Sequence, residues 1–386
     1  MKRKRLKRNG LKRIIGHLSL IAIFALSFIL YKVYFQNNEL DNEEIIVDNP
    51  VIEKVYINYL DEGGKFELPI NGSSGFASSP LTIYSQPDTS SDIIYRVNPG
   101  FGFTILSEQG DWWQINFENE LGWVLHDNCF INLPDIIPSI IYDISNSYSS
   151  KLKSSYLDIP NVTNLSHYDA QEYSKRFYKD MYIVPILYEM APKIFQTQQL
   201  ALKEGNTLII YEAFRPLEVQ KRIVDNLRQL SIDNSEVLQG LTTYPWNIGW
   251  FISTGVSNHQ KGLAVDMSLG KVNNSEVRTT GDYEYKVITD YTEYEMPTEI
   301  HELSVDAVTF KMPVDSKSST AWLESELSDH MNEYSIKLQK YAIESGLIPI
   351  ASEWWHFNDL SIEWNGSNGN YYIKNLYSRI PTNINN

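Results

Sequence analysis

The sequence predicts an α+β domain at 156–386, preceded by a small all-β barrel at 67–133 and one N-terminal transmembrane helix. Three observations support this architecture: an uncharged run near the N-terminus, a stretch of short alternating strands, and a C-terminal stretch that mixes helical periodicity with β-rich runs. A chain of 386 residues has room for two or three such domains.

The N-terminus has the pattern of a membrane anchor. A basic tail at 1–13 carries no acidic residue, and Ile14 to Tyr31 follows without a charged residue. At about 1.5 Å per residue this run is close to the thickness of a bilayer core, and the positive-inside rule places the basic tail in the cytoplasm. We therefore expect a retained single-pass anchor at 14–35, with the rest of the chain outside the cell membrane. A cleaved signal peptide is the alternative, although no small-x-small cleavage site follows the run.

Charge and cysteine content exclude several classes of protein. Residues 36–386 contain all 48 acidic residues and only 24 of the 33 basic ones, so we expect no nucleic-acid partner. The single cysteine, Cys129, excludes an intramolecular disulfide and a zinc site built from several thiolates. A transition metal in this chain must depend mainly on histidine and carboxylate ligands.

The predicted ectodomain begins with a polar, acidic stalk at 36–66 that shows little periodicity. Apolar and polar residues then alternate in short runs separated by turn residues, which predicts the strands of the barrel. These runs are Leu81–Tyr84, Ile93–Val97 and Trp113–Phe117. A segment with two prolines and many Ser and Asn residues at 134–155 is predicted to be the linker between the two domains.

The C-terminal domain mixes helices and strands. Helical spacing of apolar residues predicts helices from about Ile186 to Leu202, from Pro216 to Leu230 and from about Ser328 to Ser345. Between the first two, Thr207–Phe214 is β-rich and predicts a buried strand. The mixture predicts the α+β class.

Two segments of this domain carry residues that could hold a metal. Asp266 lies in an apolar strand, where a carboxylate is costly unless it is paired or metal-bound, and His259 can reach the same place across a turn at Gly262. In the second segment, Glu353 and His356 would share one site only if the strand twists or ends there. Three such ligands leave zinc an open position for water, whose proton a neighbouring carboxylate can take. Either histidine alone is more often structural, but together the segments predict metal-assisted amide hydrolysis.

These segments resemble the zinc D-Ala-D-Ala metallopeptidases of the vancomycin-resistance type, a family with carboxypeptidase and dipeptidase branches. The motifs are Ser-x-His-x-x-Gly-x-Ala-x-Asp at 257–266, Glu-x-x-His at 353–356 and Tyr-Glu-Ala-Phe-Arg-Pro at 211–216. The resemblance implies an α+β D,D-peptidase fold and one Zn²⁺ ion bound by His259, Asp266 and His356, with Glu353 as the general base.

The resemblance also implies three further roles. Arg215 would stabilise the oxyanion of the tetrahedral intermediate, or would otherwise be a surface ion pair at a helix start. Ser257 would contact the substrate, with a simple turn residue as the alternative. The sequence Glu353-Trp-Trp-His-Phe resembles the dipeptidase branch, in which Glu295 would bind the free amino group of the substrate. Residues 270–294 look like an insertion relative to the family.

The barrel carries a resemblance of its own. The sequence Gly110-Asp-Trp-Trp-Gln-Ile, followed by Leu121-Gly-Trp-Val, is similar to bacterial SH3-like domains. In that family the module binds cell-wall peptide or acts as a spacer. The alternative is that its tryptophans are core and rim residues without a ligand.

The expected function is therefore that of a membrane-anchored zinc metallopeptidase, similar to D-alanyl-D-alanine dipeptidases, with peptidoglycan stem peptides or D-Ala-D-Ala-type dipeptides as substrates. Its predicted location favours stem peptides, because free D-Ala-D-Ala is made in the cytoplasm. Three alternatives remain: a D,D-carboxypeptidase that trims the terminal D-Ala of pentapeptides, an endopeptidase, and a catalytically idle wall-binding protein.

Overall fold

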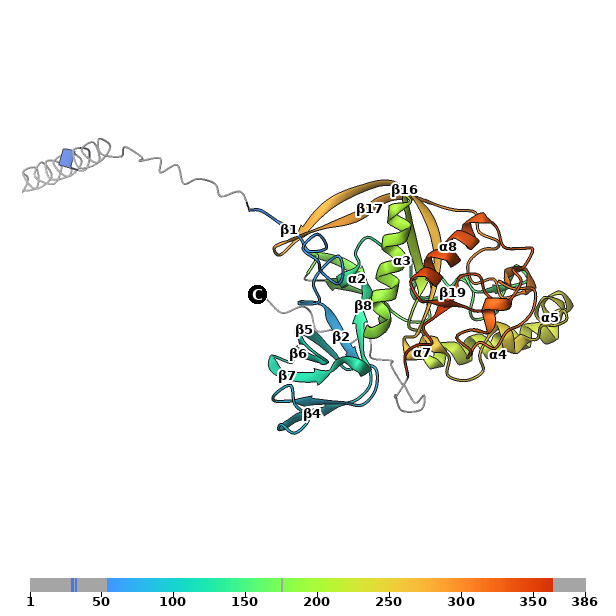
Figure 1. Cartoon of the computed structure of the whole chain (residues 1–386), viewed down its shortest axis with the longest axis horizontal. Helices are drawn as coiled ribbons and strands as arrows, with labels where there is room; N and C mark the ends of the chain where they lie inside the picture. Colours follow the sequence, from blue (N-terminus) through green and yellow to red (C-terminus); the bar gives the residue numbers. More distant parts are fainter. Residues whose placement is uncertain (1–28, 31, 33–53, 175, 364–386) are drawn as a thin grey trace, which may run out of the picture. The chain divides into compact units, whose positions relative to one another are not determined.

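The structure is a computed structural model that describes residues 29, 30, 32, 54–174 and 176–363 (Figure 1). The predicted tail at 1–13, nearly all of the predicted anchor at 14–35 and most of the predicted stalk lie outside the described residues. Within the described part of the chain, no helix is both long and apolar enough to cross a membrane. The described residues from Val55 onward belong to one compact unit.

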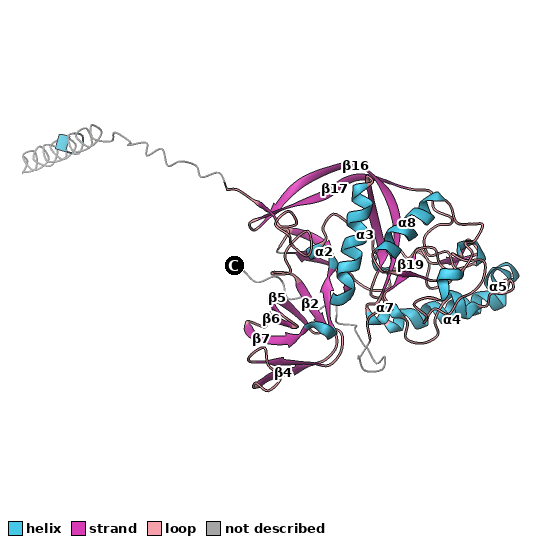
Figure 2. Ribbon diagram, in the orientation of Figure 1, coloured by secondary structure: helices cyan, strands magenta, loops and turns pink. Residues whose placement is uncertain are grey.

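A seven-stranded sheet forms the centre of the α+β part (Figures 1 and 2). Its main path runs β1, β17, β16, β15, β9, and β19 pairs with the start of β16 and with β18. The strands are β1 (Ile57–Asn58), β9 (Ile141–Tyr142), β15 (Asn206–Glu212), β16 (Ala264–Thr280), β17 (Tyr283–Glu293), β18 (Ile348–Pro349) and β19 (His356–Asn358). Strand β15 is buried along its whole length, as the predicted β-rich run requires.

Helices cover this sheet. Helices α3 and α8 pack against each other and against β15 and β16, and α4 begins directly after Pro216, as predicted. The apolar side chains of α4 recur at helical spacing and are buried. The helices are α3 (Ala191–Lys203), α4 (Leu217–Asp233), α5 (Ser235–Thr242), α6 (Ile248–Phe251), α7 (Asn258–Lys261) and α8 (Glu333–Glu344). Helix α3 begins later than predicted, because Pro185–Leu187 forms strand β14 instead.

The barrel is built on an eight-stranded sheet in the order β14, β8, β2, β5, β6, β7, β3, β4. Its strands are β2 (Ser74–Ala77), β3 (Leu81–Tyr84), β4 (Ile93–Val97), β5 (Gly102–Gln109), β6 (Trp112–Phe117), β7 (Glu120–Leu125), β8 (Cys129–Asn132) and β14 (Pro185–Leu187). All three predicted strand runs are present. Trp113 is fully buried in the barrel core, which fits a structural role for this tryptophan.

The predicted linker at 134–155 is wrong. This segment contains the end of α2 (Leu133–Ile136) and strand β9, and most of its isoleucines, among them Ile140 and Ile144, are buried. One continuous cluster of buried apolar residues runs through both the barrel and the α+β part. The prolines and serines suggested a loop, but the isoleucines between them stabilise the fold by burying their side chains in this shared core.

The end of the predicted stalk is also part of the fold. Ile57 pairs with Tyr283 of β17, and Phe66 is buried. Strand β17 forms a long antiparallel hairpin with β16, and this hairpin accounts for most of the predicted insertion at 270–294. Smaller elements complete the described chain: the hairpins β10 (Lys153–Ser154) with β11 (Leu157–Asp158) and β12 (Gln171–Ser174) with β13 (Lys179–Tyr182), and the 3₁₀ turns His126–Asn128, Ser145–Ser147, Tyr188–Met190, Val305–Ala307 and Ala321–Glu324.

Candidate metal centre

Strand register brings three polar side chains into one row. Asp266 of β16 lies directly opposite Glu212 of β15 on one side and opposite His356 of β19 on the other. Directly opposite residues point to the same face of a sheet, so the three side chains are neighbours. All three are buried. The sheet therefore builds the floor of the site from strands that are far apart in sequence.

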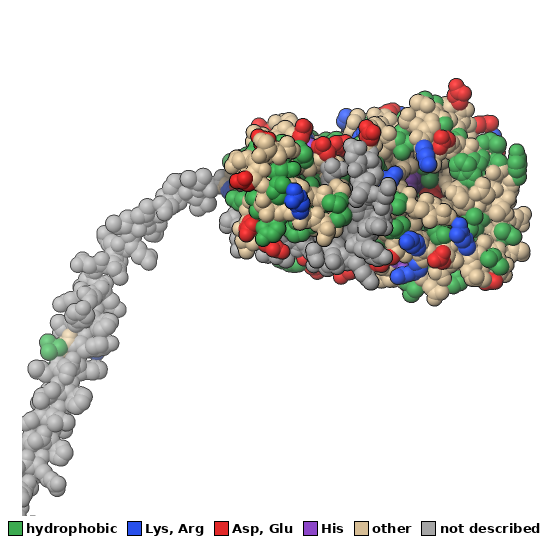
Figure 3. Space-filling model, turned by 90° about the horizontal axis from the view of Figure 1, so that it is seen from below, with side chains coloured by type: hydrophobic (Ala, Val, Ile, Leu, Met, Phe, Trp, Pro, Cys, Tyr) green, Lys and Arg blue, Asp and Glu red, His purple; other side chains and the backbone are tan. Residues whose placement is uncertain are grey.

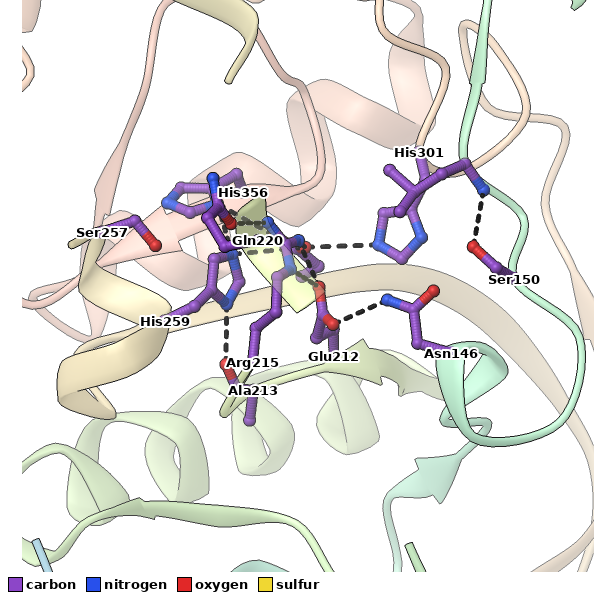
Figure 4. A network of polar contacts seen from close by, with 12 residues as sticks. Asn146, Ser150, Glu212, Ala213, Arg215, Gln220, Ser257, His259, His301 and His356 are labelled. Atoms are coloured by element: carbon purple, nitrogen blue, oxygen red, sulfur yellow. Dashed lines mark hydrogen bonds and ion pairs between the residues drawn. The ribbon is translucent and has the colours of Figure 1, made fainter. Parts of the chain in front are cut away.

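His259 reaches this row from α7. Its Nδ1–H donates to the carbonyl oxygen of Ala213 at 2.6 Å (Figure 4). A carbonyl oxygen can only accept, so Nδ1 carries the proton and Nε2 of the neutral ring is left with a lone pair. This Nε2 lies 3.1 Å from Nδ1 of His356 and 3.4 Å from Oδ2 of Asp266.

A hydrogen bond also fixes the tautomer of His356, through the ring nitrogen that faces away from Asp266. Its Nε2–H donates to Oδ1 of Asn358 at 3.0 Å, and that oxygen also accepts from Nδ2 of Asn258 at 2.9 Å. Nδ1 of His356 is therefore the unprotonated nitrogen, and it lies 2.9 Å from Oδ1 of Asp266. Second partners of this kind fix the tautomer of metal-binding histidines in proteins.

The residues His259, Asp266 and His356, the His259 trio, offer three acceptor atoms within 4.8 Å of one another in a buried place. Three lone pairs that face each other repel unless a cation lies between them. Two imidazoles and one carboxylate are a good ligand set for zinc and leave one position open. The structure thus brings together the three residues that the motifs singled out, and their chemistry fits the ion that the resemblance implied.

Glu353 lies beside the trio. Its Oε2 is 3.6 Å from Nδ1 of His356, and its side chain lines the cavity in front of the site. Burial raises the pKa of Glu353 to about 8. Strand β19 begins only at His356, and a turn at Trp354 and Trp355 precedes it. This turn satisfies the condition that the strand must end near Glu353 for both side chains to share one site.

Arg215 also lines the cavity, but most of its donors are engaged. Its Nε and one terminal nitrogen donate to Oε2 of Glu212, and the other terminal nitrogen donates to Oε1 of Gln220 at 2.7 Å. The nitrogen bound to Glu212 also lies 3.5 Å from Oδ2 of Asp266. Although burial lowers the pKa of Arg215, the Glu212 carboxylate outweighs it and raises the pKa. Arg215 therefore belongs to a buried ion pair rather than a surface one, and one of its five N–H groups has no partner among the described residues.

Two residues of the site were not among the predicted ones. Glu212 accepts from Nδ2 of Asn146 at 2.6 Å as well as from Arg215, and Nε2 of His301 lies 3.2 Å from Oδ2 of Asp266. The residues Glu212, Asp266 and His301, the His301 trio, are also close enough to hold an ion. Glu212 could have been found as an acid in a buried strand three residues before Arg215. His301 stands in a loop without a recognisable motif, so the sequence offered no comparable signal.

The two predicted substrate contacts have different outcomes. Ser257 lines the cavity, although its hydroxyl donates to Oε1 of Gln260 at 2.9 Å and so also stabilises the start of α7. Glu295 is exposed and is not among the residues that line the cavity, so its substrate contact stays a prediction. Strand β17 ends at Glu293 and Tyr294 stacks on Tyr334, which leaves Glu295 on the surface.

The cavity in front of the His259 trio has a volume of about 710 Å³. Its walls come from α6, α7, the segment 350–353 and the loop at 314–317. In the face shown in Figure 3, a histidine side chain is visible in a hollow beside lysine or arginine side chains.

Comparison with known sequence families agrees with both resemblances. Residues 186–359 match the family described as D-alanyl-D-alanine carboxypeptidase, and residues 79–128 match the bacterial SH3 domain. No curated protein matches the chain. All members of the His259 trio, Glu353 and Arg215 lie within the matched range 186–359.

Proposed function

Because residues 186–359 form a domain of the D-alanyl-D-alanine carboxypeptidase family and the chain is a D,D-peptidase, we propose that it is a zinc-dependent carboxypeptidase acting on peptidoglycan stem peptides. The observation that carries the proposal is the His259 trio, whose three lone pairs face one another beside the buried carboxylate of Glu353. The acceptors need a cation, and the carboxylate is placed to move a proton.

His259, Asp266 and His356 would hold the zinc ion. When bound, zinc would act as a Lewis acid that polarises the scissile carbonyl and lowers the pKa of the attacking water. Glu353 accepts the proton of the attacking water and delivers it to the leaving amine of the terminal D-Ala.

Arg215 contributes a fixed positive charge. Its ion pair with Glu212 and its contact with Gln220 hold the guanidinium in one orientation at the cavity wall. The free N–H is available to the carbonyl oxygen of the substrate as negative charge develops there. A donor that is oriented in advance costs no reorganisation during the reaction.

The position of Glu295 favours a carboxypeptidase over a dipeptidase. A dipeptidase needs an acid near the free amino group of its substrate, and Glu295, which the resemblance offered for this role, is exposed and outside the cavity lining. Without that acid, the N-terminal side of the substrate can be a longer peptide. The Glu353-Trp-Trp-His motif favours the dipeptidase branch, which is the second candidate.

We also propose that the enzyme is anchored in the cell membrane with the domain outside, where stem peptides are exposed. The support is the basic tail and the uncharged run Ile14–Tyr31 in the sequence. Fractionation of cells that express the full chain, with protease added to intact cells, tests this placement. Recovery of the chain in the soluble cytoplasmic fraction would contradict it.

The activity is tested with the zinc-loaded full chain on a pentapeptide that ends in D-Ala-D-Ala and on the free dipeptide. We expect release of one D-Ala from the pentapeptide, detected by mass spectrometry, with a kcat/KM at least about tenfold above that for the dipeptide. The metal-free chain and the Glu353→Gln variant serve as controls. Equal or better cleavage of the free dipeptide would favour the dipeptidase instead, and cleavage at another bond of the stem would favour an endopeptidase.

A further inference from the structure

Among the residues that the structure describes, two lysines line the cavity without a partner of opposite charge. Lys261 lies at the end of α7 and is half-buried, and Lys317 lies in the loop before the 3₁₀ turn Ala321–Glu324 and is exposed. Within 54–174 and 176–363, no side chain forms an ion pair or a hydrogen bond with either ammonium group. Both groups border the space that a substrate would occupy.

What sets Lys261 and Lys317 apart from the other lysines is that both line the cavity of the candidate metal centre. Acidic residues outnumber basic ones, 48 to 33, and other lysines find them: Nζ of Lys193 lies 2.6 Å from Oδ1 of Asp359, and Nζ of Lys311 lies 2.6 Å from Oε1 of Glu326. Burial and the neighbouring charge of Lys317 lower the pKa of Lys261. Two ammonium groups that border the same cavity, one of which lowers the pKa of the other, form a place for an anion.

We propose that Lys261 and Lys317 bind a carboxylate of the substrate and select anionic peptides. The inference rests on the proposed function, since it concerns the cavity of that same site. The chemistry admits two sources: the C-terminal carboxylate of the peptide, or a side-chain carboxylate on its N-terminal side. Because the body of the chain is acidic, a local pair of positive charges also offsets the repulsion that an anionic substrate would meet.

Three peptides of equal length separate these sources. The parent ends in D-Ala-D-Ala and carries one side-chain carboxylate, the second has that carboxylate as an amide, and the third has its C-terminus as an amide. We expect Lys261→Gln combined with Lys317→Gln to raise KM for the parent about tenfold and to leave kcat unchanged. The amide peptide that lacks the recognised carboxylate should show a high KM with the wild-type chain and no further change in the variant. The effect should shrink in 0.5 M salt, because exposed charges are screened.

Lys311→Gln is the matched control. Lys311 precedes Lys317 in the same loop, but it forms ion pairs with Glu326 and Asp329 and does not line the cavity, so its loss should leave KM for all three peptides unchanged. An unchanged KM for the parent in the double variant would overturn the proposal. So would an equal rise for all three peptides.

Failure of the proposed function can be distinguished from failure of the lysine proposal. In that case the zinc-loaded wild-type chain would release D-Ala from none of the peptides. Calorimetric titration of the wild-type chain with the parent and the two amide peptides then tests the lysines directly. Tighter binding of the parent, lost in the double variant, supports the carboxylate site even without turnover, and equal binding of all three peptides rejects it.

Discussion

The two sides of Asp266 differ although each completes a trio of possible metal ligands. On one side His259 and His356 direct unprotonated nitrogens toward the carboxylate, and on the other side Glu212 and His301 complete a second trio of similar spacing. The His301 trio already contains a cation, because the Arg215 guanidinium donates to Glu212 and lies 3.5 Å from Oδ2 of Asp266. Among the described residues, neither His259 nor His356 contacts a lysine or arginine side chain. The distances between ligand atoms alone would allow a metal at either trio. The other contacts of these residues distinguish the two: Glu212 is paired with Arg215, whereas His259 and His356 are held by hydrogen bonds that leave a nitrogen unprotonated.

The buried glutamates on the two sides show the same contrast. Burial raises the pKa of Glu353 to about 8, whereas for Glu212 the attraction of Arg215 outweighs burial and lowers the pKa. Burial also acts to raise the pKa of Asp266, but the neighbouring His259 and hydrogen bonds hold it well below its ordinary value. Arg215 thus stabilises the charge of Glu212 on one side, whereas on the other side Asp266 faces two imidazoles that can also bind a cation.

The largest expected effect is the loss of the metal from the histidine side. We expect His356→Ala to abolish stoichiometric zinc binding, because it removes one of the three ligand atoms of the His259 trio. We expect the wild-type chain to bind one zinc ion rather than two. Elemental analysis after dialysis against metal-free buffer measures both. His330→Ala, which removes an exposed histidine, should retain the wild-type content. Two ions per chain would show that the His301 trio also binds metal, and unchanged content in His356→Ala would refute the ligand set.

The second-largest expected effect is on catalysis, where substitutions of Glu353 and Glu212 should differ. Glu353→Gln should keep one zinc ion and lower kcat about a thousandfold, because the amide cannot accept the proton of water. Glu212→Gln should instead weaken the hold on Arg215 and lower kcat less, with the pH profile of kcat unchanged. Steady-state kinetics on the pentapeptide, with zinc content measured in parallel, tests the difference. Full activity in Glu353→Gln would remove it as the base.

A smaller effect is expected at His301, which acts on the metal through Asp266. Its Nε2 lies 3.2 Å from Oδ2 and leaves Oδ1 for the ion. We expect His301→Ala to weaken zinc binding by about tenfold to a hundredfold, as loss of an outer hydrogen bond typically does, and His301→Gln to restore much of it because its amide N–H can replace Nε2–H. Competition with a chelator of known affinity measures the constants. If both variants bind zinc like the wild-type chain, His301 does not orient Asp266.

The residues on one side of Asp266 could be predicted from the sequence, and His301 on the other side could not. His259, Asp266 and His356 could be predicted because the motif residues must converge for the chemistry to work, and β16 and β19 bring them together in register. His301 could not, because its place depends on a loop whose course no local pattern encodes. The linker prediction at 134–155 failed for a related reason. Prolines and serines describe local backbone preference, but the burial of the intervening isoleucines depends on the core that the barrel and the α+β part share.

The smallest expected effect is on the stability of the metal-free chain. The pKa of Glu353 in the folded state, about 8, lies above its ordinary value of 4.5, so the folded state holds a proton that the unfolded state has already lost. The free energy of unfolding should therefore fall as the pH rises from about 5 to 8, by on the order of a few kcal/mol at most. Glu212 has the opposite sign, because its pKa is lowered, so its contribution is present at neutral pH and is lost on acidification. Urea unfolding of zinc-free Glu353→Gln should lack the fall between pH 5 and 8, whereas Glu212→Gln should retain it. Parallel pH curves for the wild-type chain and Glu353→Gln would show that Glu353 is not protonated in the folded, metal-free chain.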